Sequence, residues 1–161
     1  MRRFRHFCRF ISLVLIVGLI HQSHQEFIRD LQEKGQSIEL MEVQEILPST
    51  FSLYSDSDNH SKLQALDQNE KLLGTVTQTS PDGDAAIGFS GPTNLLVIWD
   101  QEQRVSSVSI RSSGDTRDHV DAILEEPAFF DQFVGMSQQN LARLKNVEAV
   151  SGATLTSLAI V

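Results

Sequence analysis

Residues 93–112 read TNLLVIWDQEQRVSSVSIRS, and this stretch decides the fold. Its first part, Thr93–Asp100, is nearly all apolar, which is typical of a central strand that is covered on both faces. Its second part, Arg104–Ser112, alternates between polar and apolar residues in its later half, which is typical of a half-buried strand. Only Gln101–Gln103 separate the two parts, so the sequence predicts a hairpin of two adjacent strands.

Outward from this hairpin, strands come first and helices follow. Upstream, Lys71–Thr79 is rich in β-branched residues and predicts a strand, which the turn signal Pro81–Asp84 ends. Downstream, Asp115 or Thr116 is expected to cap a helix that continues to about Leu124. Further helices are expected at Pro127–Val134, Ser137–Lys145 and Leu155–Val161, and a brief strand at Val147–Val150. Strands followed by helices, without strict alternation, indicate a small α+β domain with a mixed sheet and flanking helices.

The part of the chain before this domain reads as helical. Glu26–Lys34 is expected to form one helix, and Ser37 is expected to cap a second helix at Ile38–Leu47. The polar stretch Ser49–Ser61 is expected to be a loop. We therefore divide the chain into an N-terminal segment (1–25), a helical lead-in with a loop (26–61) and a main domain (62–161).

The N-terminal segment combines basic charge with an apolar run. Four arginines stand at positions 2, 3, 5 and 9, and Phe10–Ile20 is apolar apart from Ser12 and Gly18. This run matches the apolar core of a signal peptide and is shorter than the roughly 20 residues of a comfortable membrane span. No small-residue cleavage site follows it, so we expect an uncleaved signal-anchor that crosses the inner membrane once. The arginines predict that the N-terminus stays in the cytoplasm and that the domain is periplasmic. The alternative is a buried helix of a soluble protein.

Charge and cysteine content exclude several classes of protein. The net charge is −8, and without the four N-terminal arginines 9 basic residues stand against 21 acidic ones. An acidic body of this kind argues against nucleic-acid binding. A single cysteine excludes a disulfide framework, a cysteine-based zinc site and an iron–sulfur cluster.

The tetrapeptide Ser151-Gly152-Ala153-Thr154 lies between a predicted strand and a predicted helix. A turn of small residues at this place brings backbone N–H groups close to an anion, and the helix dipole favours negative charge there. A hydroxyl in the turn can contact a phosphate or become esterified to one. The alternative is a plain helix N-cap, in which Ser151 or Thr154 bonds to a free backbone amide.

A second segment of small residues, Gly88-Phe89-Ser90-Gly91-Pro92, precedes the predicted central strand. Glycines permit close approach of the backbone to a ligand, and an aromatic side chain can pack against a ring. The alternative is a hairpin or bulge turn. We identify no catalytic acid, base or activated nucleophile and no cluster of metal-ligating residues in the sequence.

Together, these segments resemble the FMN-binding domain family. The resemblance runs from about Ser37 to Val161 and is carried, in order, by GFSGPTNLLVIWD, RVSSVSIRSSGDTRDHV, FFDQFVG and VEAVSGATLTS. Similar domains occur in the regulator of nitrous oxide reductase and in flavin subunits of the Na⁺-pumping NADH:quinone reductase and Rnf-type complexes. The resemblance implies that Thr154 is joined to FMN through a phosphoester. It also implies a Mg²⁺-dependent flavin transferase as maturation partner, which works after export and uses FAD as donor.

The resemblance implies roles for further residues. Ser151, Gly152 and Ala153 match the rest of the sequence that the transferase recognises, and Glu148 stands where the family usually has Asp. Gly88, Ser90 and Gly91 match a segment that approaches the flavin, and Thr116 lies where the related subunits have another loop beside the ring.

The implied function is that of a membrane-anchored, extracytoplasmic electron carrier. It would pass electrons between membrane redox partners and would lack a substrate pocket of its own. One alternative is an exported regulatory or interaction module without a cofactor. Another is the truncated remnant of a larger regulator.

Overall fold

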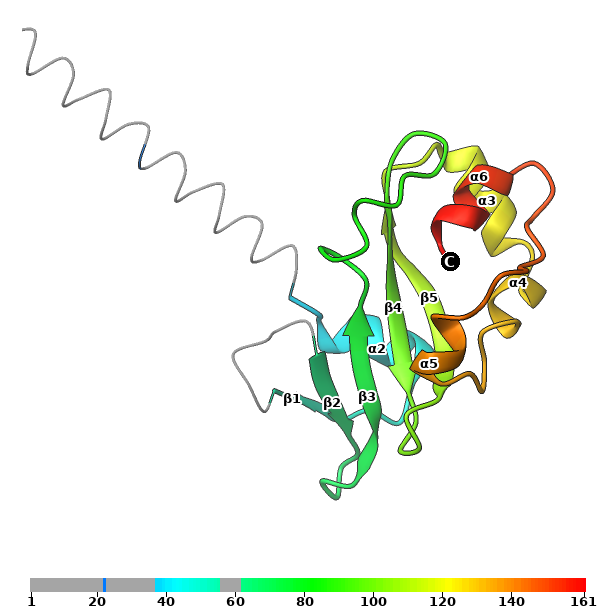
Figure 1. Ribbon diagram of the computed structural model, residues 1–161. Coiled ribbons are helices and arrows are strands. Elements are labelled where there is room, and N and C mark those ends of the chain that lie inside the picture. The colour runs from blue at the N-terminus through cyan, green and yellow to red at the C-terminus, as the bar shows by residue number, and fades with distance from the viewer. Residues whose placement is uncertain (1–21, 23–36, 56–61) are drawn as a thin grey trace, which may run out of the picture. The chain divides into compact units, whose positions relative to one another are not determined.

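The computed structural model describes Gln22 and residues 37–55 and 62–161 (Figure 1). Ile38–Val161 forms one compact unit. The anchor predicted at residues 1–25 and the helix predicted at Glu26–Lys34 lie outside the described residues, apart from Gln22. Within the described part of the chain, none of the helices has the length and apolar character needed to traverse a membrane.

A five-stranded sheet forms the centre of the unit. Its strands are β1 (Ser52–Tyr54), β2 (Lys62–Leu66), β3 (Leu72–Gln78), β4 (Thr93–Trp99) and β5 (Val105–Ser113). They follow one another across the sheet in chain order, and every neighbouring pair is antiparallel. The predicted mixed sheet is therefore wrong, whereas the α+β class is confirmed. Parallel neighbours need a crossover of a dozen or more residues, usually a helix, and none of the described helices lies between two strands of the sheet.

The helices are short and mostly follow the sheet. They are α2 (Leu40–Ile46), α3 (Arg117–Leu124), α4 (Ala128–Asp131), α5 (Gln138–Leu141) and α6 (Thr154–Ala159). Each lies within, or within one residue of, a segment that the sequence predicts as helical. The N-cap of α2 is Glu39, so Ser37 does not cap that helix. The backbone N–H of Glu39 instead donates to Oε2 of Glu42 at 2.8 Å.

Two predictions of local structure are wrong, one of a loop and one of a strand. The predicted loop Ser49–Ser61 contains β1, which pairs with β2 at the edge of the sheet, and residues 56–61 lie outside the described residues. The predicted strand Val147–Val150 joins no sheet. Its second residue, Glu148, bonds through its backbone N–H and C=O to the side-chain amide of Gln132, at 2.8 and 3.0 Å. A side chain thus occupies the place that a neighbouring strand would take.

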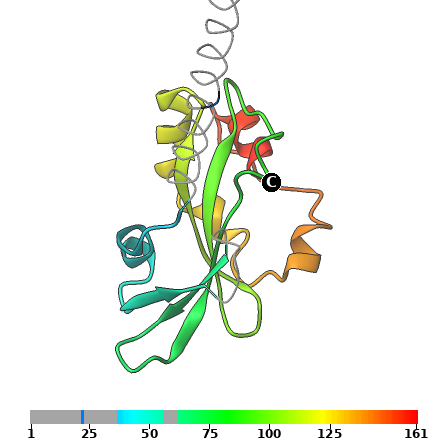
Figure 2. The ribbon, with the colours of Figure 1, turned by 90° about the vertical axis from the view of Figure 1, so that its left-hand side faces the viewer.

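Strand β4 is covered on both faces, as its apolar sequence predicts. Because side chains alternate along a strand, Leu95 and Val97 enter one core and Leu96 and Ile98 enter another. The first core contains residues of α3 and α4, and the second contains Val43 of α2. Figure 2 shows α2 on one side of the sheet and α5 and α6 on the other.

An ion pair joins α2 to the far edge of the sheet. Arg111 on β5 is only 9% exposed, and its Nε and Nη2 lie 2.9 and 3.1 Å from the two carboxylate oxygens of Glu42. Burial alone raises the pKa of Glu42. The hydrogen bonds from Arg111 and from the Glu39 amide outweigh this effect and hold the pKa below its usual range. A bidentate pair of this kind fixes the orientation of the helix as well as its position.

The end of the sheet where β4 begins and β5 ends positions the candidate site. The hydroxyls of Thr93 and Ser113 lie 2.7 Å apart, and the Gly114 amide donates to the Pro92 carbonyl at 2.8 Å. A Cβ on Gly91 would lie 2.8 Å from the backbone of Gly114, so the two segments cross in direct backbone contact. Figure 1 shows the loop before β4 gathered with α3 and α6 at this end.

Candidate functional site

The tetrapeptide predicted from the sequence forms a tight turn into α6. Gly152 has φ +85°, a left-handed conformation that favours glycine, and a Cβ there would meet nothing within 4 Å. Ala153 is buried and occupies the N-cap, with its amide donating to the Val150 carbonyl at 3.0 Å. Thr154 is the first residue of the helix and is exposed. The turn therefore presents the Thr154 hydroxyl to solvent.

Two buried hydroxyls of α6 hold this turn in place. The Ser157 hydroxyl donates to the Ala153 carbonyl at 2.9 Å and accepts from the Val150 amide at 3.0 Å. The Thr156 hydroxyl donates to Oδ2 of Asp115 at 2.5 Å. Both side chains are fully buried, in contrast to Thr154. Among the threonine and serine residues of α6, Thr154 is thus the one with an accessible hydroxyl.

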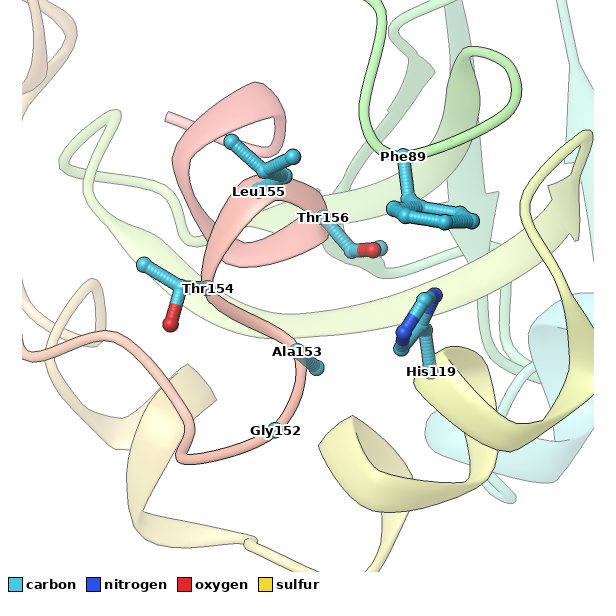
Figure 3. A pocket seen from close by; sticks show the side chains of 7 residues that line it. All are labelled: Phe89, His119, Gly152, Ala153, Thr154, Leu155 and Thr156. Atoms are coloured by element: carbon cyan, nitrogen blue, oxygen red, sulfur yellow. The ribbon is translucent and has the colours of Figure 1, made fainter.

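Beside the turn lies a cavity of about 240 Å³, shown in Figure 3. Its lining residues are Phe89, His119, Gly152, Ala153, Thr154, Leu155 and Thr156. The Phe89 ring and the His119 imidazole meet edge to face, with centroids 4.6 Å apart. Figure 3 shows the Thr156 side chain directed toward this ring pair and the Thr154 side chain directed away from it. The cavity is thus walled by two aromatic rings and by the start of α6.

The carboxylate of Asp115 contacts the backbone of the loop that carries Phe89 (residues 88–92, the Phe89 loop). Asp115 accepts hydrogen bonds from the backbone amides of Phe89, Ser90 and Gly91 and from the Thr156 hydroxyl. Burial alone raises the pKa of Asp115. These four hydrogen bonds outweigh that effect and hold the pKa below its usual range. Asp115 is therefore ionised at neutral pH and accepts from all four donors at once.

The residues predicted in the Gly88–Gly91 segment and at Thr116 lie next to the cavity without lining it. Gly88, Ser90 and Gly91 belong to the loop that carries Phe89, and Phe89 supplies the wall. Thr116 is the N-cap of α3. Its hydroxyl lies 2.8 Å from Nδ1 of His119, so Thr116 contacts the imidazole that forms a wall of the cavity.

Ser151 and Glu148 lie on another cavity. That cavity measures about 310 Å³ and is lined by residues of α4 and of the segment before α6, including Glu126, Gln132, Glu148 and Ser151. The structure therefore brings Gly152, Ala153 and Thr154 together and places Ser151 and Glu148 on the neighbouring surface. Both Ser151 and Glu148 are exposed.

A third, apolar cavity of about 220 Å³ lies against the sheet. It is lined by Trp99 and other apolar side chains of β4, β5 and α5, and by Ile160 and Val161. None of the residues predicted as site residues lines it. Among the described residues, we find no group of three or more histidine, cysteine, aspartate or glutamate side chains that could hold a metal ion.

Sequence reasoning missed three polar contributors to the site: Asp115, His119 and Thr156. Asp115 and Thr156 are 41 residues apart, and an aspartate before a helix ordinarily indicates a cap. The signal that could have found His119 is its spacing from Thr116, because side chains at positions N-cap and N3 of a helix meet.

The fit of this site to FMN can be judged from its size and walls. Pockets that bury most of a drug-sized ligand measure about 300–1,000 Å³. A cavity of about 240 Å³ therefore accepts part of an FMN molecule and leaves the rest exposed. Aromatic walls suit a planar ring, and an exposed hydroxyl at the rim suits attachment of a phosphate.

A comparison with protein families also indicates FMN as the cofactor. No curated protein sequence matches the chain. A family model described as the FMN-binding domain matches residues 88–161, which include the Phe89 loop, β4, β5 and all the helices after them. Residues 88–161 of the chain therefore match the FMN-binding domain family.

Proposed function

We propose that this protein carries FMN bonded covalently to Thr154 and works as an electron-transfer module. The observation that carries the proposal is the exposed Thr154 hydroxyl, at the first position of α6 and beside an aromatic-walled cavity, within a domain that matches the FMN-binding family. When bound, FMN supplies one- and two-electron redox chemistry, and the chain supplies its attachment and surroundings.

The attachment requires a helper enzyme. A threonine hydroxyl is a weak nucleophile unless a base activates it. His119 lines the same cavity, but the Thr154 side chain is turned away from it. We therefore propose a flavin transferase with FAD as donor. The Thr154 oxygen forms a bond to the phosphorus of the FMN half, the pyrophosphate bond breaks, AMP leaves, and the hydroxyl proton passes to solvent.

The surface around Thr154 suits recognition by such an enzyme. Ser151 and Gly152 are exposed and Ala153 is small, so an active site can close over the turn. Glu148 is exposed nearby in sequence, and its backbone is held by Gln132. We propose that these residues form the segment that the transferase reads.

We further propose an extracytoplasmic location, with residues 1–25 as a single membrane anchor. The support is the basic cluster before the apolar run Phe10–Ile20. Redox partners at the membrane would face the acidic body of the protein, in which 9 basic residues stand against 21 acidic ones, and are expected to present basic surfaces. Raising the salt concentration should then slow their encounter with this domain.

The proposal is tested by producing the full-length chain together with a flavin transferase and measuring its intact mass after denaturation. We expect the mass to rise by one FMN less one water, and the denatured band to fluoresce. Thr154→Val keeps the shape of the side chain without the hydroxyl and should abolish both signals. Ser106→Ala, which removes an exposed hydroxyl of β5 that does not line the cavity, should keep both. A Thr154→Val protein that is labelled as well as the wild type would contradict the proposal.

A further inference from the structure

Asp115 joins three segments that are far apart in the sequence. It follows β5 and precedes α3. Its Oδ2 accepts from the Phe89 amide at 3.1 Å and from the Thr156 hydroxyl at 2.5 Å. Its Oδ1 accepts from the Ser90 amide and from the Gly91 amide, the latter at 3.3 Å. One carboxylate thus connects the loop before β4, the start of α3 and helix α6, which begins at Thr154.

The loop that carries Phe89 depends on these contacts for its position. The side chains of Ile87 and Phe89 are each 58% exposed, so apolar burial does little to hold the loop. Within the loop, the Gly88 amide donates to the Gly91 carbonyl at 3.0 Å. Hydrogen bonds to an ionised acceptor are stronger than those between neutral groups. The carboxylate is therefore the main attachment of the loop to α3 and α6.

Gly88 shows how closely the loop is packed around this carboxylate. A Cβ at position 88 would lie 2.2 Å from Oδ2 of Asp115 and 3.1 Å from Cα of Thr156. Any side chain there would push the loop away from both. Glycine at this position lets the backbone approach the carboxylate and the helix together.

The same contacts set the shape of the cavity beside Thr154. Phe89 forms one wall, and Thr156, two residues after Thr154, forms another. We propose that Asp115 is a positioning residue for the cofactor: it fixes the Phe89 wall of the cavity relative to the helix that carries Thr154. The identity of the ligand rests on the proposed function, whereas the link between loop and helix rests on the hydrogen bonds alone.

The link is tested without flavin by hydrogen–deuterium exchange on the full-length protein. In Asp115→Asn, the amides of residues 89–91 should exchange at least about tenfold faster than in the wild type, because they lose an ionised acceptor. Asp118→Asn, at an exposed carboxylate of α3, is the matched control and should leave these amides unchanged. Thr156→Val removes one of the four donors and should give a smaller acceleration. Equal exchange in Asp115→Asn and the wild type would overturn the proposal.

The positioning role is tested on protein already labelled with FMN, so that loading does not differ. The visible circular dichroism of the flavin reports the fixed asymmetric surroundings of the ring. It should lose intensity in Asp115→Asn and keep it in Asp118→Asn. Faster exchange with an unchanged flavin signal would overturn the positioning role. A wild-type chain that takes no flavin would overturn the proposed function and this role with it, while the exchange comparison would still decide whether Asp115 holds the loop.

Discussion

The crossing of Gly91 and Gly114 gives a direct test of how the site is built. In Gly91→Ala, the new Cβ would lie 2.8 Å from Cα, C and O of Gly114. Carbon atoms in normal contact are about 3.5–4.0 Å apart, so the segments must separate by roughly 0.7 Å or more. All three neighbouring atoms belong to the backbone and none can rotate away. Overpacking of this kind costs about 1–3 kcal/mol. Alanine also reduces the conformational entropy of the unfolded chain, which offsets about 0.4–1 kcal/mol of this cost.

The expected net loss is therefore about 1–2 kcal/mol in the free energy of unfolding, measured by urea unfolding with Trp99, the single tryptophan, as probe. Gly135→Ala is a matched control, because Gly135 has φ +79° and open space around it. Alanine in that conformation also costs about 1–2 kcal/mol. Gly135 bonds to Val105 at the start of β5, whereas Gly114 follows its end.

The two variants should differ at the candidate site. The nine residues of β5 separate the two glycines by roughly 25–30 Å. Gly91→Ala should therefore accelerate amide exchange in the Phe89 loop, and Gly135→Ala should not. An unchanged unfolding midpoint for Gly91→Ala, or equal loop exchange in both variants, would refute the reasoning.

Three further predictions concern the ion pair, acid stability and the aromatic wall. Arg111→Met should lower the free energy of unfolding by about 1–3 kcal/mol in urea, because Glu42 loses its partner while staying 34% exposed to water. The depressed pKa of Asp115 stabilises the folded state at pH values above about 3.9, the ordinary pKa of an aspartate. This contribution is lost as the pH falls toward the folded-state pKa. The wild type should therefore lose stability below about pH 4 more steeply than Asp115→Asn does, measured by urea unfolding at each pH. Phe89→Ala should stay within about 0.5 kcal/mol of the wild type because the ring is 58% exposed, yet it should weaken the visible circular dichroism of attached FMN.

The parts of the fold that the sequence predicts are those with a local signal. The alternation and apolar runs of β4 and β5 reflect burial that the strands carry along their own length. β1 gives no such signal, because it is three residues long and lies at the sheet edge. Val147–Val150 gives a false signal, because apolar and β-branched residues indicate a strand whether or not a neighbour is present to pair with it. The Gln132 side chain that takes the neighbour's place is invisible in the local pattern.

The candidate site also has parts with a local sequence signal and parts without one. Gly152, Ala153 and Thr154 are contiguous, so their turn and helix start are legible in the sequence. Asp115 approaches the Phe89 loop across 26 residues and Thr156 across 41, and only the folded sheet brings them together. Ser151 and Glu148 are predicted with Thr154 because the resemblance assigns all three to the segment that the transferase recognises. The tight turn at Gly152 nevertheless places them on a neighbouring cavity.

The most direct measurement is the location of the flavin within the tryptic peptide that begins at Asn146, after Lys145. This peptide contains four hydroxyl residues, Ser151, Thr154, Thr156 and Ser157. Thr156 and Ser157 are fully buried, whereas Thr154 is exposed at the start of α6. Fragmentation of the peptide from protein matured with a flavin transferase should place one FMN phosphoester on Thr154. A flavin on Ser151, Thr156 or Ser157, or a peptide without flavin, would contradict the account.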